Sequence, residues 1–76
     1  MDIRRRLGLN IQRLRREKGW SQEELADRAG LHRTYISGVE RGVRNPTITI
    51  VEKLAATLGV SIGEIAGYID ASQFGV

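Results

Sequence analysis

The sequence has 76 residues, enough for one small domain over residues 1–76, and its 41% hydrophobic and 28% charged residues are ordinary for a soluble globular protein. It contains no cysteine, no secretory signal pattern and no apolar run near the roughly 20 residues of a membrane span, which argues against disulfide scaffolds, thiolate metal sites and membrane helices. The net charge of +3 and the pI near 10.0 favour an anionic partner, and we expect a cytoplasmic protein with no membrane contact, metal or cofactor.

Five segments of the chain have apolar residues at helical spacing, and none has the alternation of a strand. A glycine follows each segment, as is common where a helix ends. These glycines are Gly19, Gly30, Gly42, Gly59 and Gly67. The pattern predicts an all-α fold with helices over about 2–18, 22–29, 32–41, 47–58 and 61–67.

Start signals and apolar faces support these helices. The capping-box pattern S-x-x-E occurs at residues 21–24 and 61–64, and the fourth helix begins at Thr47 or Thr49. The residues expected to face inward are, in helix order, Ile3, Leu7, Ile11 and Leu14; Leu25, Ala26 and Ala29; Ile36 and Val39; and Ile48, Val51, Leu54, Ala55 and Leu58.

Residues 22–41 have the length and the residue types of a helix-turn-helix unit. Ala26 is small where the two helices cross, and Gly30 lies in the turn, where a positive φ is needed and a Cβ is costly. The apolar wedge between the helices is supplied by Leu25, Ala29, Leu31, Ile36 and Val39.

The stretch SQEELADRAGLHRTYISGVERGVRNPTITIVEKLAATLGVS resembles the five-helix DNA-binding domain of the phage repressor and Cro type, the xenobiotic-response-element family, and the resemblance covers about residues 3–66. Within that family, LHRTYISGVERGVRN is particularly similar to the small controller proteins of restriction–modification systems. The resemblance implies a transcriptional regulator that binds a symmetric DNA operator as a homodimer. The narrower match implies control of its own operon and of an endonuclease gene.

The third helix is the recognition helix of such a unit, which enters the major groove of double-stranded DNA and reads base edges. On a helical wheel its polar residues lie opposite Ile36 and Val39, and Gly38 on this outward face permits close approach of the DNA. Base contacts are expected from Arg33, Thr34, Tyr35 and Ser37. The alternatives are an ordinary surface arginine at position 33 and a tyrosine at position 35 that only shields the junction of two helices.

Positive charge is concentrated in residues 1–20 and 31–46, while acidic residues dominate 21–30 and 47–76. The first turn of a helix favours an anion, and the resemblance places a phosphate near Gln22 and near the loop after the third helix. Phosphate contacts are expected from Gln22, His32, Arg41, Arg44 and Asn45. For His32 the alternatives are a base contact, a weak helix cap or no functional role. The resemblance also implies a structural ion pair between Arg15 and Glu40.

Residues 61–76 contain more apolar side chains than so small a core needs, so we expect helix five and the tail to form the dimer surface. The residues concerned are Ile62, Ile65, Tyr68, Ile69 and Phe74. The alternative is that they close the bottom of the core. The regulator would act by occupancy, either blocking RNA polymerase at one site or recruiting it at another.

An enzyme is not expected, because the chain has one histidine, no cysteine and no nucleophile–base pair or metal-ligand spacing. The alternative of a different class is an antitoxin or other interaction module whose apolar C-terminal surface binds a partner protein. A methylase or endonuclease gene beside this one would favour a controller, whereas a small toxin gene would favour an antitoxin.

Overall fold

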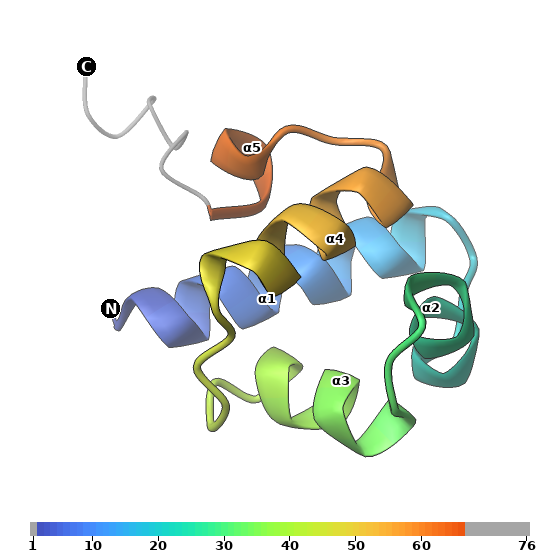
Figure 1. Cartoon of the computed structure of the whole chain (residues 1–76), viewed down its shortest axis with the longest axis horizontal. Coiled ribbons are helices and arrows are strands. Elements are labelled where there is room, and N and C mark those ends of the chain that lie inside the picture. The colour runs from blue at the N-terminus through green and yellow to red at the C-terminus, as the bar shows by residue number, and fades with distance from the viewer. Residues whose placement is uncertain (1, 67–76) are drawn as a thin grey trace.

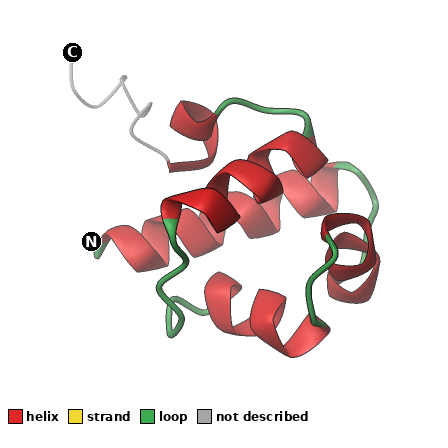
Figure 2. Cartoon of the chain, in the orientation of Figure 1, coloured by secondary structure: helices red, strands yellow, loops and turns green. Residues whose placement is uncertain are grey.

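The computed structural model describes residues 2–66, where five helices follow one another: α1 (Ile3–Glu17), α2 (Gln22–Ala29), α3 (Arg33–Glu40), α4 (Ile48–Leu58) and α5 (Ile62–Ala66) (Figure 1). No strand occurs in this part of the chain (Figure 2). The predicted all-α, five-helix fold is therefore confirmed, and each helix begins and ends within one residue of its expected bounds. None of these helices has both the length and the apolar character needed to cross a membrane.

Capping boxes start α2 and α5, but only the second box is complete. The Oγ of Ser21 accepts a hydrogen bond from the N–H of Glu24 at 3.0 Å, while the Glu24 carboxylate accepts one from Arg28 on the next turn. At α5, Ser61 Oγ accepts from the N–H of Glu64 at 3.1 Å, and Glu64 Oε1 accepts from the N–H of Ser61 at 2.9 Å. Each such cap satisfies N–H groups that have no partner within the helix.

The starts of α1 and α4 are capped by single side chains. Thr47, rather than Thr49, caps α4, because its Oγ1 accepts a hydrogen bond from the N–H of Ile50 at 3.3 Å. At α1 the Asp2 carboxylate accepts from the N–H of Arg4 at 2.9 Å. A second hydrogen bond, from the Arg4 side chain, lowers the pKa of Asp2 below its ordinary value.

The expected glycines follow the helix ends. Backbone φ angles of 70° to 79° are found at Gly19, Gly30, Gly42 and Gly59. The fifth expected helix end, Gly67, lies outside the described residues.

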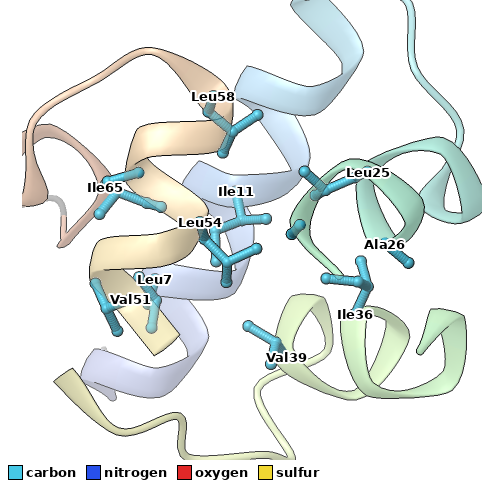
Figure 3. Packing of buried hydrophobic residues seen from close by; sticks show 12 residues of the cluster. Leu7, Ile11, Leu25, Ala26, Ile36, Val39, Val51, Leu54, Leu58 and Ile65 are labelled. Carbon is cyan, nitrogen blue, oxygen red and sulfur yellow. The ribbon is translucent and has the colours of Figure 1, made fainter. Parts of the chain in front are cut away.

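The core lies where α1 and α4 pack together, with α2 and α3 on one side and α5 on the other (Figure 1). Figure 3 shows Ile36 of α3 and Leu25 of α2 pointing toward the interior that Leu54 of α4 occupies. The buried hydrophobic residues are Leu7, Ile11, Leu25, Ala26, Ala29, Ile36, Val39, Val51, Leu54, Ala55, Leu58 and Ile65. The core thus anchors α3 by one face only.

Two residues of the expected apolar faces differ from prediction. Ile48 is 68% exposed and Ile3 is 57% exposed, whereas Leu14 packs against the core as expected and is partly buried. Ile48 and Ile3 begin their helices at one end of the molecule, where the packing of α1 against α4 gives way to an open groove of about 300 Å³. This groove, which we call the apolar groove, is lined by Ile3, Leu7, Asn45, Pro46, Ile48, Val51, Ile62 and Ala66.

Candidate nucleic-acid interface

A tight turn joins α2 to α3 and sets the angle between them. Gly30 adopts φ 70°, a left-handed conformation that glycine takes without the penalty of a Cβ. The N–H of Leu31 then donates to the carbonyl oxygen of Ala26 at 2.8 Å, which closes the end of α2 in a Schellman-type motif. Ala26 itself is 1% exposed, so its small side chain lies inside the helix–helix contact.

The packing of α3 separates an anchored face from a solvent face. Ile36 and Val39 are fully buried, while Arg33 and Thr34 are exposed. The side chains of Tyr35 and Ser37 are half-buried, between the anchored face and the solvent face. The four residues expected to contact bases therefore come from one short helix whose opposite side is held by the core.

A buried polar network ties α1 to the end of α3. Arg15 Nε donates to Glu40 Oε2 at 2.7 Å, and Arg15 Nη2 donates to Glu40 Oε1 at 3.0 Å. Arg15 Nη1 donates to the carbonyl oxygen of Trp20 at 2.8 Å, and Gln22 Nε2 donates to Glu40 Oε1 at 3.0 Å. The Gln22 side chain is thus held against α3 by its amide nitrogen, at the first residue of α2.

The loop after α3 folds back onto that helix. The N–H groups of Val43 and Arg44 both donate to the carbonyl oxygen of Gly38, at 3.0 and 3.2 Å. Gly42, with φ 79°, lies against α1: a Cβ there would come within 3.1 Å of the Cα of Arg5. The loop backbone is therefore fixed on two sides.

The sequence of this chain matches a protein-family model over most of its length. The helix-turn-helix family model HTH_3 matches residues 11–65. This chain belongs to the helix-turn-helix family. It is a DNA-binding transcriptional regulator, and its relatives include control proteins of restriction–modification systems.

Several relatives match this helix-turn-helix regulator over most of its length. The HTH-type transcriptional regulator y4dJ of Sinorhizobium fredii is 48% identical over 75 residues, which are 99% of this chain and 97% of y4dJ. Control protein C.MunI of a Mycoplasma species is 40% identical over 70 residues, 91% of this chain and 95% of C.MunI. Other relatives are longer, since the chain covers 51% of SinR from Bacillus subtilis.

Solved structures share the fold of this regulator. The transcription factor NHTF from Neisseria superposes with a TM-score of 0.87 at 42% identity, covering 96% of this chain and 85% of NHTF. SinR in complex with DNA superposes with a TM-score of 0.74 at 42% identity, covering 78% of this chain and 95% of the SinR chain in that complex.

The remaining expected DNA-contacting residues surround α3 of this helix-turn-helix regulator. His32 occupies the N-cap position of α3 but makes no side-chain capping hydrogen bond, and it is exposed. Arg41, Arg44 and Asn45 are also exposed, and Asn45 lies at the rim of the apolar groove. Arg41 Nε donates to the carbonyl oxygen of Ser37 at 3.4 Å, so this cation stays close to α3.

The structure differs from two expectations for this regulator. Gly38 is buried rather than bare, because the side chain of Arg44 lies over it. Ile65 of α5, expected at a dimer surface, is fully buried in the core, so its side chain is not exposed to a partner. Ile62 is 36% exposed and remains available. The other expected dimer residues, Tyr68, Ile69 and Phe74, lie outside the described residues.

Sequence reasoning missed two residues that shape the interface. A Cβ at Gly8 would approach the carbonyl carbon of Glu40 at 2.8 Å and collide with the carbonyl oxygen of Val39, so Gly8 permits the close contact of α1 with α3. A glycine inside a helical pattern is the available signal for such an approach. Arg5 was also missed: its Nη1 lies 3.5 Å from the carbonyl oxygen of Arg41, which brings another cation to the loop. Among residues 2–66 no group of three potential metal ligands comes together.

Proposed function

We propose that the chain binds a two-fold symmetric operator as a homodimer, with α3 of each protomer in the major groove. The observation that carries the proposal is that α3 has one buried apolar face and one exposed polar face. Ile36 and Val39 are fully buried, and the opposite side presents hydrogen-bonding side chains to solvent. A helix held by its apolar face and polar on the other is what major-groove reading requires.

In this proposal the base contacts come from the first two turns of α3. The Arg33 guanidinium pairs in bidentate fashion with O6 and N7 of a guanine, a contact that discriminates by about 1–3 kcal/mol. Thr34 and Ser37 offer hydroxyl groups to a base edge, and Tyr35 contacts a thymine methyl group. The exposure of Arg33 and Thr34 supports these roles.

Phosphate contacts flank α3 in this proposal. Gln22 lies at the first residue of α2, where backbone N–H groups and the helix dipole favour an anion. On the other flank, Arg41 is an exposed cation, and Asn45 is exposed in the loop that follows it. His32 precedes α3 and donates from its ring. Such contacts fix the orientation of the protein on the duplex without reading its sequence.

The homodimer is proposed to form through the apolar groove and α5. One recognition helix contacts too few base pairs for specificity, whereas two helices about 34–36 Å apart read two half-sites. Ile3, Ile48 and Ile62 gather around this groove with exposed side chains. Figure 1 places α5 on the far side of α1 and α4 from α3, so a second copy on α5 leaves both recognition helices free.

Regulation in this proposal works by occupancy of the operator in the bacterial cytoplasm, blocking or recruiting RNA polymerase. The similarity to C.MunI supports a controller of a restriction–modification operon, and the similarity to SinR bound to DNA supports the docking mode. No effector is required, because operator occupancy rises with protein concentration.

Selection from a randomised duplex library at about 0.15 M salt tests the proposal. We expect recovery of a two-fold symmetric consensus with half-sites about 10–10.5 base pairs apart. Failure to enrich any consensus would contradict sequence-specific regulation and would favour the protein-interaction alternative.

Sedimentation equilibrium tests the dimer separately. The wild-type chain should dimerise, and Ile62→Glu should shift the equilibrium toward monomer because it places a charge on the proposed interface. Thr57→Glu, on α4 away from the groove lining, is the control. An unchanged association constant for Ile62→Glu would place the dimer interface elsewhere.

A further inference from the structure

We propose that Gly38 is a positioning residue for DNA recognition: it has no side chain so that Arg44 can lie across the outward face of α3 and read a base edge there. This inference rests on the proposed function of α3. It departs from the sequence-based expectation in two respects, since Arg44 was expected on a phosphate and Gly38 was expected to be bare.

The Arg44 side chain lies directly against Gly38. A Cβ at Gly38 would lie 2.6 Å from Arg44 Cγ and 3.5 Å from Arg44 Nε. The first distance is shorter than non-bonded carbon atoms allow, so a Cβ at position 38 and the Arg44 side chain in this position exclude each other. The Arg44 side chain therefore occupies the space that a side chain at position 38 would fill.

The position of Gly38 on α3 determines which face of the helix the Arg44 side chain covers. Gly38 lies one turn after Thr34, on the side of the helix away from the buried Ile36. It is nevertheless buried, and the atoms nearest to the position of its missing Cβ belong to the Arg44 side chain. Arg44 thus supplies, from the loop, the side chain that α3 lacks at the middle of its outward face.

The guanidinium of Arg44 is held at its far end as well. Its Cζ lies 5.8 Å from the centroid of the Tyr35 ring, within the range of a cation–π contact. Tyr35 and Gly38 are three residues apart and are therefore neighbours on the helix surface. Tyr35 orients the head of Arg44 while Gly38 accommodates its stem, so the cation is ordered before DNA arrives.

The loop backbone is fixed independently of this side chain. The N–H groups of Val43 and Arg44 donate to the Gly38 carbonyl oxygen, and Gly42 lies against Arg5 of α1. The three atoms that lie nearest to a methyl group at position 38 all belong to the flexible side chain of Arg44. Gly38→Ala should therefore displace the Arg44 side chain and leave the fold intact, with an equal or higher Tm because alanine favours the helix.

A double-mutant cycle on the duplex selected by the wild-type chain tests the inference. We expect Gly38→Ala and Arg44→Ala each to weaken binding by about 5- to 150-fold and to lose preference at the same base pair of each half-site. The double variant should bind no more than about twofold weaker than the weaker single variant. Arg44→Lys should lose the same preference although its charge is retained, because an ammonium lacks the bidentate fork.

Three results would overturn the inference. One is a Gly38→Ala variant with wild-type affinity and consensus. Another is independent, multiplicative losses for the two single variants. The third is an equal loss on all sequences for Arg44→Ala, which would make Arg44 a phosphate contact. If the wild-type chain itself selects no consensus, the proposed function fails first, and that outcome is separate from a failure confined to Gly38→Ala.

Discussion

Arg15 and Glu40 form a two-point ion pair in the interior, with Nε to Oε2 at 2.7 Å and Nη2 to Oε1 at 3.0 Å. The two side chains are 9% and 1% exposed, so neither charge is stabilised by water. Their partners are one another, the Trp20 carbonyl oxygen and the Gln22 amide. The pair joins α1 to the last residue of α3 and so holds the C-terminal end of α3 in place.

Removing one partner of this pair should be costly. Arg15→Ala or Glu40→Ala leaves a buried charge without compensation, and we expect each to lower the free energy of unfolding by about 3–5 kcal/mol. The double variant Arg15→Met with Glu40→Leu should lie closer to wild type than either, since no charge is then buried alone. Urea denaturation followed by circular dichroism measures all three.

The exposed pair between Arg13 and Glu17 provides the control, because both side chains are more than half exposed. Arg13→Ala should cost less than about 1 kcal/mol. If Arg15→Ala were no more destabilising than Arg13→Ala, the buried pair would have no structural role.

Gly8 should tolerate no side chain. In Gly8→Ala the added Cβ meets backbone atoms of Val39 and Glu40, which cannot move without shifting α3 away from α1. We expect a loss of about 1–3 kcal/mol in thermal or chemical unfolding, and a weaker affinity for DNA. Leu9→Ala, on the solvent side of the same helix, should change stability by less than about 1 kcal/mol. Equal effects for the two variants would argue against the close packing of α1 on α3.

Arg41 should contribute affinity without specificity. If its guanidinium contacts a phosphate, Arg41→Ala should weaken binding to all sequences alike and reduce the slope of log affinity against log salt by about 0.9. Titration of the selected duplex and of a scrambled duplex at several salt concentrations measures this. An Arg41→Ala variant that loses preference for one base pair but keeps its salt slope would make Arg41 a base reader instead.

Much of the fold is predictable from sequence because its signals act over a few residues. Ser21 and Ser61 cap their helices where expected, Thr47 is one of the two residues expected to start α4, and Gly30 takes the left-handed conformation that the turn requires. Apolar spacing likewise identifies Ile36 and the rest of the core face of α3. These are local relationships between backbone geometry and side-chain type.

Other features depend on neighbours that periodicity does not reveal. A helical wheel places Gly38 on the outward face correctly, but only the folded loop shows that Arg44 covers it. Ile48 has the spacing of a core residue, yet α4 begins beyond the packed interior, so it stays exposed. The Arg15–Glu40 pair joins residues 25 apart in sequence, and it was expected only from a family resemblance.

The most direct test of major-groove reading by α3 is dimethyl sulfate protection of the selected operator. The reagent methylates guanine N7 in the major groove and adenine N3 in the minor groove. We expect the wild-type chain to protect guanine N7 in both half-sites, and Arg33→Ala, an exposed residue of α3, to lose protection of one guanine in each. Protection confined to adenine N3, or a pattern that Arg33→Ala leaves unchanged, would contradict the account.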